Sequence, residues 1–355
     1  MNINKRNRHQ RSLWAATGIG VAALLLVGTS LTASAGSNVP ATKGTVSVNV
    51  GTKNISLKLP MRIGMFTSAG TASFGGAEDT QMMSFAKAHK MKVTFFDAAF
   101  NSTTQFNQIQ TAIQDKKFNV LVVLPVDGQT ICKELSQTAP NAGLLVVDVD
   151  QPLCGRFTRE GNALWQPGTL DYISGYDTKT TLGQYIAAIA KANPGPQTVG
   201  VVEGVASDGL STNINNIVAA TEKSDPNFKV VATANTDYSS EAGYTDTQSM
   251  LQAHPDISVI ISSQSNITEG AARAISGLGD SKKVYLADYG GDAAVVALMK
   301  LGEVSLTTPT WPTLEGTTLM QVLINTSHGK KAQRLISLPF KVITPANVAS
   351  YKPEY

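Results

Sequence analysis

The sequence has 355 residues, of which 42% are hydrophobic and only 15% are charged. This length allows one large domain or two ordinary ones, and the composition is typical of a folded rather than a disordered protein. The formal net charge is +3, but four positive residues within Lys5–Arg11 lie in a segment without acids, and the rest of the chain carries −1. The protein therefore has no basic field that would attract nucleic acid, and we expect no nucleic-acid partner.

Residues 1–35 have the three parts of a cleavable secretory signal peptide. Lys5–Arg11 is basic, Ala15–Leu31 is apolar, and Ala33–Ala35 is a small-residue cleavage motif. An uncleaved membrane anchor is the alternative, although the apolar run is interrupted by glycine and is short for a span. No cysteine stands directly after the apolar run, so a lipid anchor is not expected. We therefore expect a periplasmic protein.

Residues 36–60 differ from the rest of the chain. Apolar residues alternate with polar ones on both sides of the turn-forming segment Gly51–Asn54. A period of two around a turn predicts a β-hairpin. We expect an N-terminal appendage here and assign no function to it.

From residue 62 to residue 150, short apolar runs alternate with segments whose apolar residues recur at helical spacing. This alternation predicts strands linked by helices in right-handed crossovers, and hence a parallel sheet. The run 144–151 is apolar and β-branched and then ends on Asp150 and Gln151, as expected of a strand buried on both faces. A helix carrying Ile131 and Leu135 is expected before it. The expected strands are 63–66, 93–96, 120–124 and 144–151.

A second alternation of the same kind begins near residue 178, after an irregular segment at 152–171 and a short strand at 172–174. Two arrays exceed what one compact sheet holds, so we expect an α/β fold with two lobes, each built on a parallel sheet. A late helix and a last strand at 335–342 lie outside both arrays. The expected strands of the second array are 199–202, 230–234, 259–262, 284–286 and 305–307.

Catalytic and cofactor motifs are mostly absent from the sequence. It has no Walker-type phosphate loop, no dinucleotide-binding glycine motif, and no zinc-protease or serine-hydrolase motif. The three histidines after residue 35 follow no expected strand, so we expect no metal site, no cofactor and no enzymatic activity. Carboxylates at strand ends could still form the acid–base pair of a glycosidase. These carboxylates are Asp97, Asp127, Asp150 and Asp288.

Polar and aromatic residues follow the expected strands in both arrays. The carboxyl ends of parallel strands share one edge of a sheet, where ligands bind in open α/β folds. Carboxylates and amides hydrogen-bond to hydroxyls, and aromatic rings cover the C–H faces of a sugar, so the set suits a polyhydroxylated ligand. The alternative for each residue is a role in its own loop, and Asp150 could cap a turn. The set is Ser68, Ser73, Phe74, Asp150, Gln151, Ser207, Asp208, Asp237, Tyr238, Gln264, Asn266, Asp288 and Tyr289.

The sequence has two cysteines, Cys132 and Cys154. An exported protein can oxidise such a pair to one disulfide, and two buried free thiols are the alternative. If the strands 120–124 and 144–151 are neighbours, both cysteines lie at the same edge of the first lobe, which favours the disulfide.

Over residues 62–345 the chain resembles the periplasmic sugar-binding proteins of ABC importers, of the ribose- and galactose-binding type. The most specific feature is Leu251–Ile260, a helix–His-Pro-Asp–strand run, and the others are Phe74, Val147–Asp150 and Leu301–Val304. The resemblance implies a type I periplasmic binding protein fold, with two Rossmann-like lobes joined by three crossings near 175, 308 and 338. The N-terminal lobe would then comprise 61–175 and 309–337, and the C-terminal lobe 176–308 and 338–355.

The resemblance also implies a ligand site between the lobes. Its residues would be Ser68, Phe74, Asp150, Gln151, Asn213, Tyr238, Gln264 and either Asp288 or Tyr289. Gln151 stands where the family often has arginine, and a second family arginine falls near Asn213. A family asparagine becomes Leu124, and a stacking aromatic becomes Gly75. These departures predict a less charged pocket, which suits a neutral sugar or polyol better than a sugar acid or phosphate.

The resemblance implies the solute-binding component of an ABC transporter. We expect a monomer that binds a neutral monosaccharide or sugar alcohol between its lobes and delivers it to the membrane permease. Two alternatives remain from the sequence. One is a ligand-binding receptor for a sensor kinase, and the other is a secreted glycosidase.

Overall fold

The computed structural model describes residues 39–70, 73–279 and 284–355, and the statements below concern these residues. The expected signal peptide lies outside them. Within these three ranges, no helix is both long enough and apolar enough to cross a membrane.

The appendage expected at residues 36–60 is a β-hairpin. Strands β1 (Thr45–Asn49) and β2 (Asn54–Lys58) pair in antiparallel fashion. Ile55 and Leu57 are buried and belong to the same apolar core as the first sheet. The predicted hairpin is confirmed, and its apolar face is covered because it packs on the N-terminal lobe.

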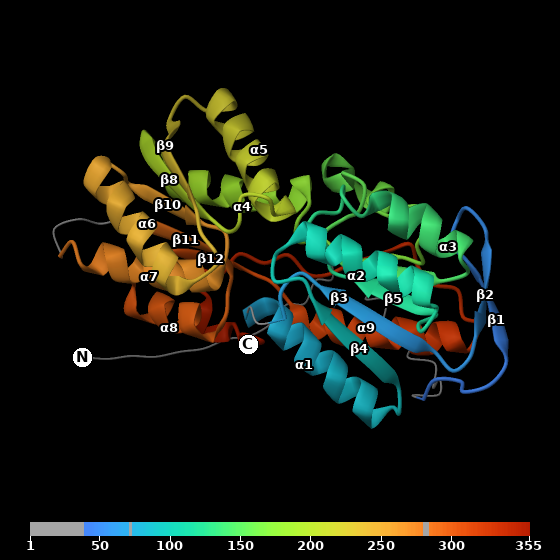
Figure 1. Cartoon of the computed structure of the whole chain (residues 1–355). Coiled ribbons are helices and arrows are strands. Elements are labelled where there is room, and N and C mark those ends of the chain that lie inside the picture. The colour runs from blue at the N-terminus through green and yellow to red at the C-terminus, as the bar shows by residue number, and fades with distance from the viewer. Residues whose placement is uncertain (1–38, 71–72, 280–283) are drawn as a thin grey trace, which may run out of the picture. The chain divides into compact units, whose positions relative to one another are not determined.

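The N-terminal lobe is built on a six-stranded parallel sheet with the order β13-β7-β6-β5-β3-β4. Apolar side chains of α1 and α9 belong to the core on one face of the sheet, and those of α2 belong to the core on the other. Figure 1 shows the arrangement of these helices around the strands. Its strands are β3 (Arg62–Thr67), β4 (Lys92–Asp97), β5 (Val120–Val123), β6 (Leu145–Asp150), β7 (Tyr172–Ser174) and β13 (Leu335–Ser337). Its helices are α1 (Ser73–Ala88), α2 (Ser102–Asp115), α3 (Ala139–Asn141) and α9 (Pro312–Ser327).

The C-terminal lobe is built on a five-stranded parallel sheet with the order β12-β11-β10-β8-β9. Apolar residues of α4 and α5 pack on one face, and those of α6, α7 and α8 pack on the other. Its strands are β8 (Gln197–Glu203), β9 (Phe228–Asn235), β10 (Val259–Ser262), β11 (Tyr285–Gly290) and β12 (Leu306–Pro309). Its helices are α4 (Lys179–Ala192), α5 (Gly209–Ser224), α6 (Ser240–Ala253), α7 (Ser265–Ser276) and α8 (Ala293–Leu301). The predicted α/β fold with two parallel sheets is confirmed.

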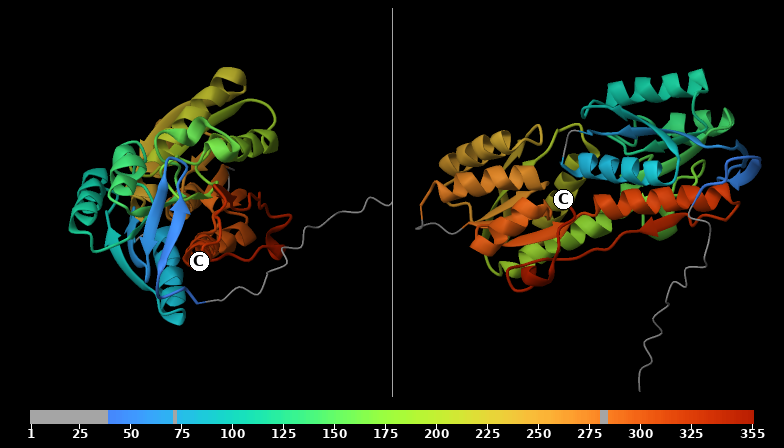
Figure 2. Two further views of the ribbon diagram at one scale, coloured as in Figure 1. Left: turned by 90° about the vertical axis from the view of Figure 1, so that its right-hand side faces the viewer. Right: turned by 90° about the horizontal axis from the view of Figure 1, so that it is seen from below.

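The chain passes between the two sheets three times. It leaves β7 for α4, returns from β12 to α9, and after β13 reaches the C-terminal lobe again, where Ile343 bridges Thr307. Trp311 connects these crossings, because its backbone N–H donates to the Tyr176 hydroxyl oxygen at 2.7 Å and its Nε1 donates to the Pro339 carbonyl at 2.7 Å. The C-terminal residues lie where the lobes meet (Figure 2).

Two expected elements differ from the structure. The last strand ends at Ser337 rather than at residue 342, because the chain there leaves the first sheet for the other lobe. The helix expected around Leu135 is a π-helical turn, Glu134–Thr138, followed by the short α3. Pro140 has no N–H to donate, so a regular α-helical hydrogen-bond ladder cannot continue through it.

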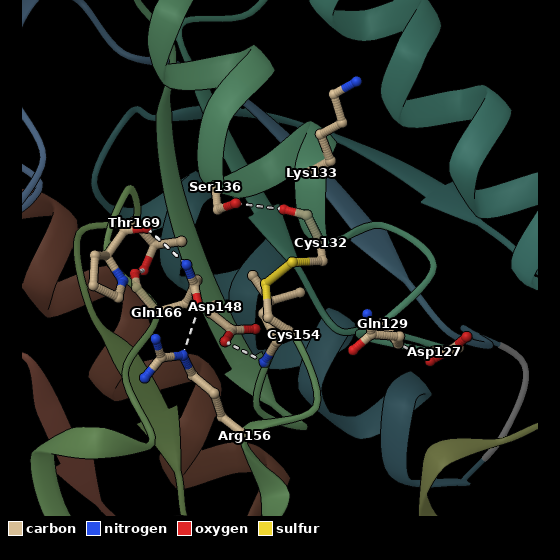
Figure 3. Close-up of a disulfide and its surroundings, with 12 residues drawn as sticks. Asp127, Gln129, Cys132, Lys133, Ser136, Asp148, Cys154, Arg156, Gln166 and Thr169 are labelled. Atoms are coloured by element: carbon tan, nitrogen blue, oxygen red, sulfur yellow. Dashed lines mark hydrogen bonds between the residues drawn. A yellow bond between two sulfur atoms is a disulfide. The ribbon is translucent and has the colours of Figure 1, made fainter.

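Cys132 and Cys154 form a disulfide with an S–S distance of 2.06 Å (Figure 3). It joins the turn before the π-helical segment to the loop after β6. Strands β5 and β6 are neighbours, which is the condition under which both cysteines were expected at one edge of the lobe. The Asp148 carboxylate accepts a hydrogen bond from the Leu153 N–H at 3.2 Å, which holds the same loop. The bond closes a loop with a sequence separation of 22, and chain entropy then predicts a stabilisation of about 3 kcal/mol.

Candidate functional site: a cavity between the lobes

A cavity lies where the carboxyl ends of both sheets face each other, and we call it the interlobe cavity. Its walls in one lobe come from the loops after β3 and β4, the start of α1 and the end of β6. In the other lobe they come from the segments after β8, β9 and β10 and the end of β11, and the crossings complete them. The N-terminal lobe contributes Ser68, Phe74, Phe100, Asp150 and Gln151, and the C-terminal lobe contributes Asp208, Tyr238, Gln264 and Tyr289. The crossings and the C-terminal residues contribute Asp177, Thr310 and Tyr355.

The structure brings most of the residues expected at the site to this cavity. The ones that line it are Ser68, Phe74, Asp150, Gln151, Tyr238, Gln264 and Tyr289. Asn213 and Asp288 do not line it. Asn213 is half-buried on α5.

Asp288 is fully buried within the C-terminal lobe. Its carboxylate accepts hydrogen bonds from the Thr268 and Thr307 hydroxyls, each at 2.6 Å, and from the Gly291 N–H at 2.8 Å. Burial raises the pKa of Asp288 to about 6, although these hydrogen bonds oppose the shift. Asp288 therefore fixes the ends of neighbouring elements, and the next residue, Tyr289, faces the cavity. The alternation of side chains along a strand explains why a shift of one residue exchanges their roles.

Asp150 is fixed through its backbone. It ends β6 in the left-handed conformation, with φ of 64°. Its N–H donates to Glu315 Oε1 at 3.0 Å, and its carbonyl accepts from the Tyr172 hydroxyl at 2.6 Å. No hydrogen bond from another described residue reaches its carboxylate, which lines the cavity instead of capping a turn. Burial, together with the charge of Asp208, raises the pKa of Asp150 to about 7.

Gln151 links the two lobes directly. Its Nε2 donates to Asp208 Oδ1 at 2.8 Å, and Asp208 also accepts from the Leu210 N–H at 3.1 Å and from the Tyr238 hydroxyl. Asp208 is thus the N-cap of α5 as well as a contact between lobes. A Cβ on Gly209 would lie 2.2 Å from Gln151 Oε1, so this approach requires glycine there.

Aromatic rings form the remaining walls. Phe74 lies edge-on to Tyr176, with 6.1 Å between ring centroids, and to Tyr355, with 6.5 Å. Phe100 from the loop after β4 stacks on Tyr238 from the loop after β9, with 4.5 Å between centroids. Phe100 and Tyr238 both have positive φ angles, 55° and 66°. Such strain in non-glycine residues is common at ligand sites.

Sequence reasoning missed seven residues of the cavity lining, which are Ala69, Phe100, Asp177, Leu210, Ser263, Thr310 and Tyr355. Phe100 could have been predicted from the sequence, because it closely follows the expected strand 93–96, as the other predicted site residues follow theirs. Thr310 and Asp177 lie in crossings, and Tyr355 is far from any strand. Only the path of the chain between the lobes brings these three to the cavity.

The cavity is acidic. Asp150, Asp177 and Asp208 line it, and no lysine, arginine or histidine is among its described lining residues. Glu78 on α1 and Glu315 on α9 are fully buried nearby. Burial raises the pKa of Asp177 and of Glu315, and neighbouring carboxylates, including Asp150 in both cases, add to the shift. The less charged pocket expected from the loss of two arginines is therefore rich in carboxylates without a balancing cation.

Comparisons with known proteins identify relatives of the chain. A model of the periplasmic binding protein domain family matches residues 63–331. The chain is 26% identical to the ribose import binding protein of Bacillus subtilis over 263 residues, which cover 73% of this chain and 79% of that protein. It is 21% identical to a D-ribose/D-allose-binding protein of Pseudomonas aeruginosa over 246 residues, covering 64% of this chain and 70% of that protein.

Solved structures share the fold. An ABC transporter solute-binding protein from Bacillus halodurans, with bound myo-inositol, has a TM-score of 0.71 at 17% identity and covers 83% of this chain and 98% of that one. A Caulobacter myo-inositol binding protein has a TM-score of 0.69 at 21% identity, with coverage of 82% and 95%. At these identities the likeness concerns the type I periplasmic binding protein fold.

Proposed function

Because the chain belongs to the periplasmic binding protein domain family, we propose that it is the solute-binding component of an ABC importer. It binds a monosaccharide or sugar alcohol between its lobes and delivers it to a membrane permease. The observation that carries this proposal is the interlobe cavity, in which carboxylates, amides and aromatic rings from both lobes converge.

The chemistry of the cavity suits a polyhydroxylated ligand. The Asp150 carboxylate can accept from two hydroxyls at once, and charge-assisted hydrogen bonds of this kind are about twice as strong as neutral ones. Gln151 and Gln264 add amide groups from opposite lobes. Phe74 and Tyr289 offer ring faces and edges to the C–H groups of a sugar. A sugar acid or phosphate would bring a second negative charge to the carboxylates, so neutral sugars and sugar alcohols are the first ligands to test.

The remaining parts of the proposal follow from the sequence. Residues 1–35 act as a cleaved signal peptide that takes the protein to the periplasm, where it functions as a monomer. We propose no catalytic step.

A thermal shift panel tests the proposed function. Pentoses, hexoses, inositols and linear sugar alcohols are added one at a time to the purified protein. A ligand at 100 times its Kd should add about 2.7 kcal/mol to the free energy of unfolding. Chromatography of the same samples follows turnover, and unchanged ligand is expected. Failure of every sugar and sugar alcohol to raise the melting temperature would contradict the proposal.

A further inference from the structure

The starting observation is the carboxylate of Asp177. It lies in the first crossing, only 3% of the residue is exposed, and it lines the interlobe cavity. No hydrogen bond from another described residue reaches this carboxylate. Burying a carboxylate without a partner is costly, so a residue in this position calls for a group that the ligand supplies.

Asp150, at the end of β6, resembles Asp177 in its surroundings. Its carboxylate also lines the cavity without a hydrogen-bond partner among the described residues. Burial raises the pKa of Asp177 most, and the negative charges of Asp150 and Asp208 raise it further. The three carboxylates are therefore close enough to repel one another. Glu315 Oε1 accepts a hydrogen bond from the Asp150 N–H. Burial raises the pKa of Glu315, and the negative charges of Glu78 and Asp150 raise it further.

No positive side chain offsets this charge. The described lining of the cavity contains no lysine, arginine or histidine. For Asp150 and Asp177, the charges that shift the pKa are all carboxylates. A neutral sugar can donate hydroxyl hydrogen bonds, but it brings no positive charge to carboxyl groups whose burial and mutual repulsion disfavour ionisation, whereas a cation between them would favour their ionised forms.

We propose that the ligand is an amino sugar or an aminated sugar alcohol, whose ammonium group binds between Asp177 and Asp150 while its hydroxyls bind the amides. This rests on the proposed function and narrows its ligand class. An ammonium has three donors and a full positive charge, which matches two acceptor-only carboxylates.

The test uses matched pairs that differ only in one group. Glucosamine is compared with glucose, galactosamine with galactose, glucamine with glucitol, and an inosamine with the corresponding inositol. The N-acetylated forms serve as uncharged controls of similar shape. Isothermal titration at neutral pH measures each affinity. In at least one pair we expect the amino compound to bind about tenfold or more tightly than both its hydroxyl and its N-acetylated counterparts.

Variants then locate the charge. Asp177→Asn should reduce the ratio of amino to hydroxyl affinity by about tenfold, because it keeps the shape and removes the charge. Asp150→Asn should reduce the same ratio. Asp256→Asn removes an exposed carboxylate of the C-terminal lobe and should leave the ratio unchanged. Melting curves of the ligand-free variants check that each one is folded.

The outcomes separate this inference from the proposed function. If hydroxyl compounds bind as tightly as their amino counterparts, the proposal of an amino ligand is wrong, and the proposed sugar-binding function is retained. If no compound of either series binds, both fail. A further experiment measures whether magnesium chloride or calcium chloride alone stabilises the protein. Stabilisation by either salt that Asp177→Asn abolishes would assign the carboxylates to a metal ion and overturn the inference.

Discussion

Phe100 of the N-terminal lobe and Tyr238 of the C-terminal lobe stack across the interlobe cavity, with ring centroids 4.5 Å apart and planes inclined by 28°. The Gln151–Asp208 hydrogen bond joins the same two lobes. Both contacts require the lobes to be close together, so they stabilise the closed arrangement even before a ligand contributes.

The stack between Phe100 and Tyr238 predicts an effect on closure. An aromatic pair contributes about 0.5–1.5 kcal/mol beyond its buried area, so Phe100→Ala should lower ligand affinity by roughly 2- to 12-fold. The ligand-free variant should also have a larger radius of gyration in small-angle scattering. Phe106→Ala, which removes a ring on α2 within one lobe, is the control. An unchanged radius and affinity for Phe100→Ala would mean that the stack has no part in closure.

The close approach of Gly209 to Gln151 predicts a second effect on closure, which a double variant can test. In Gly209→Ala the new methyl group would displace the Gln151 amide from Asp208, and we expect a loss of about 1 kcal/mol in ligand binding. Combining it with Gln151→Ala should add no further loss, because the obstructed side chain is gone. Gly183→Ala on α4 is the control, since no atom lies within 4 Å of its new methyl. Additive losses in the double variant would contradict this explanation.

Asp150 predicts the largest single effect on affinity. Asp150→Asn keeps the shape but turns one acceptor oxygen into a donor, so a ligand group would face the wrong partner. The cost should be about 1–3 kcal/mol, or roughly 5- to 150-fold in affinity by calorimetry. The melting temperature of the ligand-free variant should not fall. Binding as tight as that of the parent would remove Asp150 from the site.

The buried carboxyl group of Asp171 predicts how the free energy of unfolding depends on pH. Burial raises the pKa of Asp171 to about 8, against the lowering effect of Arg334, and both carboxyl oxygens lack a hydrogen-bond partner. The folded state therefore holds this proton more tightly than the unfolded state, where the pKa is about 4. The resulting stability is fully present below pH 4 or so and is lost as the pH rises through about 8.

Urea unfolding at several pH values tests this expectation. The free energy of unfolding should fall between pH 5 and pH 8.5, with a contribution from Asp171 on the order of 1–4 kcal/mol. Asp171→Asn should make the decline shallower. The exposed control Asp256→Asn should decline like the parent. A parent protein that is equally stable at both pH values would contradict the protonated state of these buried groups.

The disulfide predicts the effect of reduction. Replacing both Cys132 and Cys154 with serine should lower the free energy of unfolding by about 2–4 kcal/mol, because the unfolded chain regains the entropy of an open loop. Dithiothreitol should destabilise the parent and have no effect on the double variant. Thiol titration of the denatured, unreduced parent should detect no free thiol, and two free thiols would exclude the bond.

The sequence predicted the sheets better than it predicted the cavity. Strand ends are local features, so the apolar run before Asp150 identified both a buried strand and a residue at its tip. The sequence left the choice between Asp288 and Tyr289 open because one residue reverses the face of a strand, and the hydrogen bonds to Asp288 show which of the two faces the interior of the lobe. Asp177 could not be found, since its place depends on how the chain crosses between lobes. The sequence named Asp150 and Asp208 but not Asp177, so it did not show that three carboxylates share the cavity.

Trp311 has a practical consequence for observing the protein. Its backbone and indole hydrogen-bond to two other crossings, so movement of the lobes changes the surroundings of its ring. Trp165, by contrast, lies beneath the Arg334 guanidinium and beside the hairpin turn at Gly51, away from the crossings. Changes in intrinsic fluorescence on opening and closing should therefore come from Trp311, while the emission of Trp165 stays constant. Rapid mixing could then time each step of ligand capture without any added dye.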